Sequence, residues 1–311
     1  AKALSTEARI VIMDEPTAAL SQGEIADLFR IVRQLQAAGK AILFISHKFE
    51  EIFAIADRWA VFRDGRLVGA GAIGETSRDA LVAMMVGRRL DQVFPKREVP
   101  IGDTVLEVEG LSYGREFADV SFRLRRGEIL GFYGLVGAGR SEVMQVLFGI
   151  SRPDAGSVRL NGRELAVANP ADAIRAGIAY VPEDRQLQGA ILAMSIKDNV
   201  TLPTLERTNG GLLLHEERER ALTRRYGERL AVKAAAWDQH VETLSGGNQQ
   251  KVVIARWLAT EPKVMILDEP TKGIDVGSKA AVHDFMGELV EAGLAVILVS
   301  SELPEVMGMS D

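Results

Sequence analysis

Short apolar runs bounded by charged or turn residues recur along the chain. They include RIVIMDE and AILFIS near the start and VMILDE and AVILVSS near the end. Continuous apolar runs of this length are typical of parallel strands buried on both faces. Stretches with helical spacing lie between them, such as GEIADLFRIVRQLQAAG, which Gly39 closes. Strands that alternate with helices predict an α/β fold. The charged stretch HEERERALTRRYGERLAVKAAA at 215–236 predicts a helix in a separate helical lobe.

An internal repeat decides the organisation of the chain. ALSTEARIVIMDEPT at 3–17 resembles WLATEPKVMILDEPT at 257–271, an offset of 254 residues. The register continues without a gap through GKAILFISHKFEE at 39–51 and GLAVILVSSELPE at 293–305. Of the 57 paired positions, 18 are identical. A repeat of this kind indicates a duplicated domain.

The offset also predicts domain boundaries. The second copy begins near Val105, so the matching start of the first copy falls about 150 residues before Ala1. We therefore expect residues 1–94 to be the C-terminal part of a first domain, 95–104 a linker, and 105–311 a second domain truncated after Asp311. A partial first domain is expected to leave apolar strand edges and faces uncovered.

Composition narrows the class of protein. With 311 residues, 47% hydrophobic and 26% charged, the chain is a globular protein with a core. No apolar run reaches the roughly 18 residues of a membrane span, and the start lacks the pattern of a secretory signal. We therefore expect a chain that is neither exported nor membrane-spanning. The absence of cysteine excludes disulfides and thiolate metal sites, and a net charge of −6 argues against nucleic acid as a partner.

A glycine-rich loop follows an apolar run in GFYGLVGAGRSE. Gly134, Gly139 and Ser141 match the pattern G-x-x-x-x-G-K-[ST], but Arg140 stands where the pattern has lysine. The glycines let backbone N–H groups point at phosphate oxygens, and Ser141 offers a hydroxyl to Mg²⁺. Taken alone, the loop is equally compatible with a tight turn between a strand and a helix.

Two further motifs follow later in the chain. In ETLSGGNQQKVVIARWLA, Ser245 and two glycines precede a predicted helix, which makes either an anion site or a simple N-cap. The strand VMILDEPT delivers Asp268 and Glu269 at its carboxyl end. Adjacent carboxylates there can hold Mg²⁺ and orient or deprotonate a water, although an isolated Asp-Glu pair is usually a solvated loop start.

Together these motifs, with MDEPT repeated in the first copy, resemble the ATP-binding subunits of ABC transporters. The likeness is strongest to the two-domain subunits of bacterial monosaccharide importers of the ribose, galactose and xylose kind. GLVGAGRSE, YVPEDRQLQGAI and LSGGNQQKVVIARWLA resemble the second domain of that subfamily, where arginine is usual in the loop. The resemblance covers essentially the whole chain. It implies a P-loop NTPase fold of the ABC ATPase type, with a mostly parallel sheet core, a helical lobe and an antiparallel β part.

The resemblance also implies cofactors and residue roles. In ABC proteins two nucleotide-binding domains pair head to tail, and each ATP lies between the phosphate loop of one and the signature of the other. Mg²⁺ would be bound by Asp14, Asp268 and Ser141, and the catalytic residues would be Glu15, His47 and Glu269. Glu15 and Glu269 would act as general bases, and His47 would contact the γ-phosphate. The residues expected to contact ATP are Gly134, Gly137, Ala138, Gly139, Arg140, Ser141, Glu183, Ser245, Gly246, Gly247 and Gln249.

The departures from the family pattern fall in the second copy. It has Arg140 for lysine and Ser301 at the position of His47, so the site that contains them is expected to be weak. Glu183 replaces the usual glutamine, and its carboxylate can still reach Mg²⁺ or water. Tyr113 is either an adenine-stacking aromatic or a core residue.

The resemblance thus implies a peripheral subunit at the cytoplasmic face of a bacterial plasma membrane. It would hydrolyse Mg·ATP to drive sugar import through separate permease subunits and, through them, a periplasmic or extracellular sugar-binding protein. The alternatives are a soluble ABC ATPase acting on ribosomes or DNA, and a non-catalytic nucleotide-binding fragment. The chain by itself is expected to bind ATP weakly and not to sustain hydrolysis.

Overall fold

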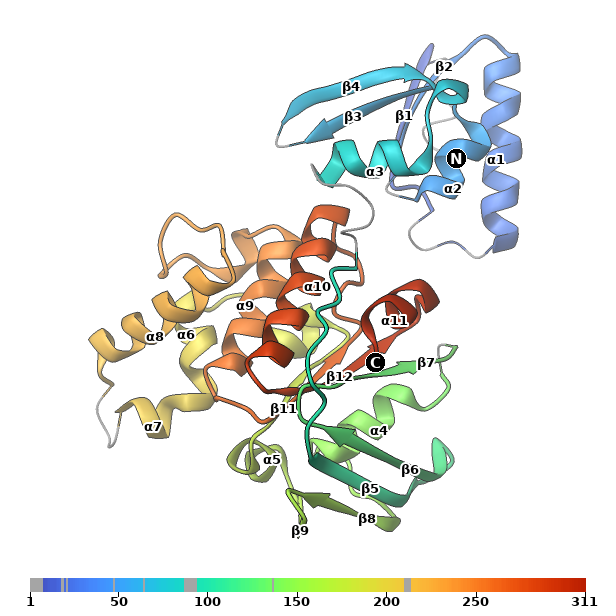
Figure 1. The fold of residues 1–311 in the computed structure, drawn as a ribbon. Coiled ribbons are helices and arrows are strands. Elements are labelled where there is room, and N and C mark those ends of the chain that lie inside the picture. The colour runs from blue at the N-terminus through green and yellow to red at the C-terminus, as the bar shows by residue number, and fades with distance from the viewer. Residues whose placement is uncertain are drawn as a thin grey trace. The chain divides into compact units, whose positions relative to one another are not determined.

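The chain forms two compact units in the computed structural model, which describes residues 8–17, 20, 22–46, 48–63, 65–86, 94–135, 137–209 and 214–311. The first unit consists of Ala1–Gln92 with Asp275–Gly277, and the second of Val93–Ile274 with Ser278–Asp311 (Figure 1). Across the described ranges, every helix is too short or too polar to cross a membrane.

The first unit combines a parallel strand pair with an antiparallel hairpin. β1 and β2 pair in parallel, and α1 packs on them through the edge-on contact of Phe29 with Phe44. Gly39 takes a φ of +76° just after α1, so the predicted end of this helix is confirmed. The elements of the unit are β1 (Ile10–Asp14), α1 (Gln22–Ala37), β2 (Ala41–Ile45), α2 (Phe49–Ile55), β3 (Arg58–Arg63), β4 (Arg66–Ala72), the 3-10 turn Ile73–Glu75 and α3 (Arg78–Val86).

The second unit places a parallel sheet beside an antiparallel one, so the predicted fold class is confirmed. The parallel strands lie in the order β10-β11-β12-β7, and the antiparallel strands in the order β6-β5-β8-β9. The strands are β5 (Thr104–Tyr113), β6 (Phe117–Arg125), β7 (Ile129–Tyr133), β8 (Ala155–Leu160), β9 (Arg163–Glu164), β10 (Ile178–Val181), β11 (Val264–Asp268) and β12 (Ala295–Ser300). The helices are α4 (Arg140–Leu147), α5 (Pro170–Ala176), a π-helical turn (Arg185–Gly189), α6 (Ile196–Thr201), the 3-10 turns Leu202–Thr204 and Val241–Thr243, α7 (Leu205–Asn209), α8 (Glu216–Arg229), α9 (Gly246–Leu258), α10 (Val276–Glu291) and α11 (Leu303–Met309).

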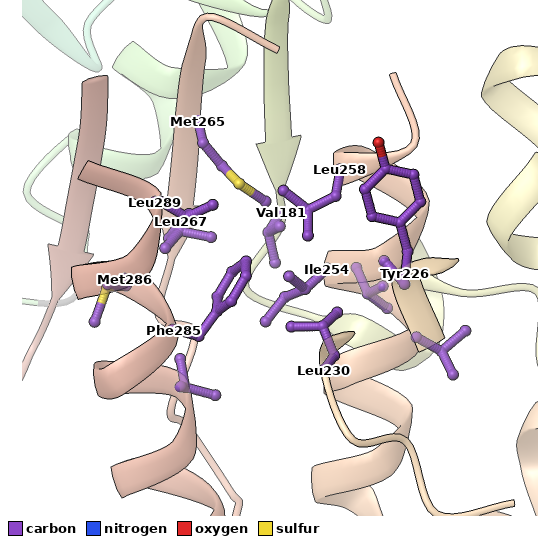
Figure 2. Packing of buried hydrophobic residues seen from close by; sticks show 14 of the residues in the cluster. Val181, Tyr226, Leu230, Ile254, Leu258, Met265, Leu267, Phe285, Met286 and Leu289 are labelled. Carbon is purple, nitrogen blue, oxygen red and sulfur yellow. The ribbon is translucent and has the colours of Figure 1, made fainter. Parts of the chain in front are cut away.

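The predicted helical lobe is present but shares its core with the sheet. Helices α6, α8, α9 and α10 and the strands β10 and β11 contribute to one buried cluster. In Figure 2, Phe285 of α10 and Ile254 of α9 point toward one another, close to the strand residues Leu267 and Val181. The lobe is therefore anchored to the strand that carries Asp268.

The helix predicted over 215–236 ends earlier, at Arg229. Ala231 adopts a φ of +47°, and the chain then leaves the helix. The backbone N–H of Lys233 donates to Asn248 Oδ1 at 2.9 Å, and that of Ala235 donates to Gln239 Oε1 at 3.0 Å. Because side chains satisfy these donors, helix formation is not needed, and the prediction for 230–236 was wrong.

The two units repeat the same local structure 254 residues apart. The bounds of β1, α1 and α2 recur in β11, α10 and α11, and the β1–β2 register recurs between β11 and β12. Even an unusual backbone feature recurs, because Glu15 and Glu269 have φ values of +42° and +47°. Their N–H groups donate to Ile45 O at 2.9 Å and Val299 O at 2.8 Å.

The units differ in how their strands are covered. Both faces of β11 and β12 are buried, as predicted. Residues of β5, β6 and α4 pack against one of these two faces. The corresponding face of β1 and β2 is exposed within the described residues, at Ile10, Ile12, Leu43 and Ile45. Burial on both faces therefore holds only for the second copy, and the expectation of uncovered apolar strand faces in the first copy is confirmed. Identical strand patterns thus have different environments, since burial depends on segments distant in sequence.

Candidate functional site

The predicted phosphate loop runs from the end of β7 into α4. Gly137 and Gly139 have φ values of +80° and +84°, which L side chains rarely adopt. A Cβ atom added at Gly139 would come within 2.5 Å of Glu116 O, whereas nothing lies within 4 Å of one added at Gly137. Position 139 therefore requires glycine both because a side chain would not fit and because of its backbone conformation. Val136 of the same loop lies outside the described residues.

This difference gives a paired test of the loop. Gly137→Ala is expected to lower the free energy of unfolding by about 1 kcal/mol, the cost of the left-handed conformation. Gly139→Ala is expected to cost about 3 kcal/mol, because overpacking against Glu116 is added. Urea denaturation of both variants measures the difference, and equal costs would contradict the described loop.

Asp268 lies at the carboxyl end of β11 and is fully buried. Tyr180 Oη donates to its Oδ2 at 3.0 Å, whereas Oδ1 is buried and has no hydrogen-bond partner among the described residues. Burial raises the pKa of Asp268 to about 6; the hydroxyls of Ser141 and Tyr180 oppose this, and the negative charges of Glu183 and Glu269 add to it. One oxygen of this buried carboxylate therefore has no hydrogen-bond donor among the described residues.

Glu269 is held through both of its carboxylate oxygens. Arg140 Nη2 lies 3.3 Å from Oε1, and Ser301 Oγ donates to Oε2 at 3.0 Å. The side chains of Arg140 and Glu269 are only 10% and 7% exposed. Burial raises the pKa of Glu269, while Ser301 and Arg140 act to lower it. Arg140 and Ser301, two of the positions at which the second copy departs from the family pattern, therefore contact the same carboxylate.

The site leaves a donor unpaired as well as an acceptor. Arg140 Nη1 is buried and has no hydrogen-bond partner within the described ranges. An unpaired buried donor is costly and suits an anion, and Asp268 Oδ1 suits a cation. No group of three or more Asp, Glu, His or Cys side chains in the described part of the chain could hold a metal by itself. Mg²⁺ commonly takes one or two protein ligands and completes its shell with phosphate and water, so Ser141 and Asp268 fit it.

Glu183 pairs with a lysine that the sequence did not single out. Lys272 Nζ lies 2.5 Å from Glu183 Oε1, and the neighbouring Arg185 donates to Lys272 O at 2.8 Å and Gly273 O at 3.1 Å. A Cβ atom added at Gly246 would come within 2.9 Å of Arg185 Nη2. The loop after β10 therefore links the loop after Glu269 to the start of α9.

The signature residues form the first turn of α9. The glycines Gly246 and Gly247 lie inside the helix, which corrects the prediction that they precede it. Ser245 is the N-cap residue, but its hydroxyl accepts from Asn248 Nδ2 at 3.0 Å in place of a backbone N–H. Gln249 is buried and donates to Val241 O at 3.3 Å, so its side chain faces the interior.

For the remaining predicted residues the structure shows fewer contacts, and one of them lies outside the described residues. Asp14 and Glu15 lie at the end of β1 and are exposed, unlike their buried counterparts at the end of β11. His47 lies outside the described residues. Tyr113 is partly buried, with its ring 6.2 Å from that of Phe117 and packed against the second hydrophobic cluster. Stacking on adenine stays a prediction.

Sequence reasoning missed Tyr180 and Lys272. Tyr180 stands in the wholly buried strand IAYV, in which nothing distinguishes a functional hydroxyl from a core aromatic. Lys272 carries a visible signal, since the second copy reads DEPTKG where the first reads DEPTAA. A lysine three residues after Glu269 marks a change in local charge.

Comparisons with known proteins identify the family of the chain. Residues 117–272 match the family model described as ABC transporter. The whole chain aligns with a ribose import ATP-binding protein of Rhizobium meliloti at 64% identity, covering 62% of that protein. It also aligns with one of Bacillus cereus at 48% identity, covering 63% of it. The chain thus spans less than two thirds of the length of these relatives.

Solved structures show the same fold. A nucleotide-free ATP-binding cassette from an ABC transporter superposes with a TM-score of 0.57 at 23% identity, over 67% of this chain and 86% of the other. An ATP-binding cassette in its ADP conformation gives a TM-score of 0.56 at 24% identity, over 67% and 85%.

Proposed function

The chain belongs to the ABC transporter family, and from this premise we propose that its second unit binds ATP with Mg²⁺ at the loop Gly134–Ser141. The observation that carries the proposal is the pair of buried, unpaired atoms Arg140 Nη1 and Asp268 Oδ1. A phosphate oxygen would satisfy the first and a cation the second.

Each residue of the loop has a part in this proposal. Backbone N–H groups between Gly134 and Gly139 would contact phosphate oxygens, and the N-terminus of α4 would add its positive end. Ser141 and Asp268 would hold Mg²⁺, which when bound neutralises phosphate charge. The N–H of Ala138 donates to Leu135 O at 3.1 Å within the same loop, so this donor would have to leave Leu135 to contact a phosphate oxygen.

We further propose that the first unit supplies the hydrolytic residues. Asp14 would bind Mg²⁺, Glu15 would act as the general base and His47 would contact the γ-phosphate. The recurrence of β1, α1 and α2 after 254 residues supports domains at 1–94 and 105–311 joined by a linker at 95–104. Nucleotide domains would pair head to tail, with Ser245, Gly246, Gly247 and Gln249 forming the signature.

For the whole protein we propose ATP hydrolysis that powers sugar import. The names of the relatives support a ribose-like sugar. The partners would be permease subunits and a sugar-binding protein, with this subunit peripheral on the cytoplasmic face of the membrane. A pull-down that recovers ribosomes in place of a permease would favour the soluble alternative.

A second role, non-catalytic nucleotide binding, is favoured for the second unit alone. Both oxygens of Glu269 are engaged by Arg140 and Ser301, so this carboxylate is poorly disposed to accept a proton from water.

Titration with a fluorescent ATP analogue tests binding at the loop. Binding is expected to require Mg²⁺, and Ser141→Ala and Asp268→Asn should each weaken it by about 10-fold or more, since a ligand to the metal is lost or weakened. Ser151→Ala, in the loop after α4, is the matched control. Affinity that is independent of Mg²⁺, or equal in all four proteins, would refute the assignment.

A further inference from the structure

The segment Phe94–Pro100, here called the strap, runs beside α10 before β5 begins (Figure 1) and contacts α11 through Phe94. The Phe94 ring lies 5.1 Å from the His283 ring of α10. It also covers Gly308 of α11, where an added Cβ atom would come within 2.6 Å of the Phe94 ring. The bare backbone at Gly308 therefore makes the space that Phe94 occupies.

Charged contacts hold the next part of the strap. Arg97 lies 2.8 Å from Asp284 and forms a closer ion pair with Glu291. Its side chain passes over Gly287, where an added Cβ atom would come within 2.9 Å of it. Gly287 of α10 is thus a second glycine, after Gly308 of α11, that provides room for the strap.

None of these features recurs in the first unit. At the equivalent positions, 254 residues earlier, α1 and α2 carry Phe29 for His283, Arg30 for Asp284, Arg33 for Gly287, Ala37 for Glu291 and Ala54 for Gly308. Arg33 there donates to Ala54 O at 3.4 Å, across the equivalent of the two glycines. The space that Gly287 and Gly308 provide for the strap is therefore a property of the second unit and not of the repeat.

Beneath Phe94, a buried polar network leads to the candidate site. His283 Nε2 lies 2.6 Å from Glu305 Oε1, and both side chains are at most 2% exposed. Glu305 also accepts from Thr271 Oγ1 at 2.8 Å and from Ser300 Oγ at 2.5 Å. Thr271 is two residues from Glu269, and Ser300 precedes Ser301, which donates to Glu269.

The contacts of Glu305 favour its ionised form. Burial acts to raise the pKa of Glu305, and the hydrogen bonds from His283 and Ser300 outweigh it and hold that pKa below its ordinary value. In the first unit the equivalent carboxylate, Glu51, accepts from Ser46 at 2.8 Å and pairs with Lys48 at 3.3 Å. At the position of His283 the first unit has Phe29, so within the described residues the histidine link between this carboxylate and Phe94 is found in the second unit.

We infer that Phe94 is a positioning residue, which fixes the turn carrying Ser301 and the loop carrying Thr271 through His283 and Glu305. Docking of the strap and nucleotide binding at Gly134–Ser141 are then coupled, so that each stabilises the other. The inference rests on the proposed nucleotide site and adds a means of regulating it from the segment that enters the second unit.

The test is the affinity of the protein for a fluorescent ATP analogue with Mg²⁺. Phe94→Ala is expected to weaken binding by about 5- to 30-fold, within the range of coupling between distinct sites. Phe94→Tyr, which keeps the ring, should restore binding, and Phe62→Ala, at an exposed aromatic of the first unit, should leave it unchanged. Gly308→Ala provides a milder variant, because the added Cβ atom displaces the Phe94 ring. Alanine is also the residue at the equivalent position of α2, Ala54.

A double-mutant cycle separates positioning from simple stabilisation. If Phe94 acts through Glu305, Phe94→Ala should have no further effect on affinity in a Glu305→Gln background. Lower melting temperatures for Phe94→Ala and Gly308→Ala with unchanged affinity would overturn the inference, and so would additive effects in the cycle. If Ser141→Ala weakens binding while the strap variants do not, the strap inference alone fails; if the parent binds no nucleotide, the proposed function fails.

Discussion

Glu15→Gln is expected to lower ATP turnover by roughly 10²- to 10⁴-fold, the usual size of the loss when a general base is removed. Glu269→Gln is expected to leave most of the turnover intact. The two residues have the same backbone conformation at the same point of the repeat. Glu269, however, is engaged by Arg140 and Ser301, so it is already unavailable as a base before the substitution.

The measurement is phosphate release in steady state. Because the chain spans 62% of the Rhizobium meliloti relative, it is best made on a protein that joins this chain to the remaining parts of that relative. Nucleotide affinity is measured beside it, since a base variant should lose turnover and keep binding. Equal losses from the two substitutions would show that the Arg140 contact opens during turnover and that both carboxylates serve as bases.

The features that sequence predicted are those that depend on the order of neighbouring residues along the chain. The spacing of Gly134, Gly139 and Ser141 placed a loop between β7 and α4, and the glycine φ values agree with it. The offset of 254 residues placed the strands and helices of the repeat, because the same apolar periodicity generates the same elements.

The features that sequence did not predict depend on which side chains meet in three dimensions. No local pattern indicates that Arg140, at the start of α4, reaches Glu269 at the end of β11. The strand pattern around Ile10 and Ile12 does not show their exposure, since the equivalent Val264 and Ile266 are wholly buried by packing from β5 and α4, and only the incomplete repeat predicted it. Tertiary contacts decide such features, and the sequence alone left them open.

Restoring the family pattern in the second copy should reverse its weakness. The double variant Arg140→Lys with Ser301→His is expected to raise hydrolysis at the second site by about 10-fold or more, part of the contribution of a general base. Lysine is a compact charge that can pair with phosphate without the planar fork that now reaches Glu269. Histidine at 301 would supply the γ-phosphate contact that the serine hydroxyl, committed to Glu269, does not make.

The double variant is measured in a Glu15→Gln background, so that residual turnover belongs to the second site. Each single substitution is expected to change little, because either Arg140 or Ser301 still holds one oxygen of Glu269. A double variant that also carries Glu269→Gln is the control and should lose whatever was gained. If the double variant binds and hydrolyses ATP no better than its background, the contacts of Glu269 are not what limits this site, and the limit lies in the signature that faces it.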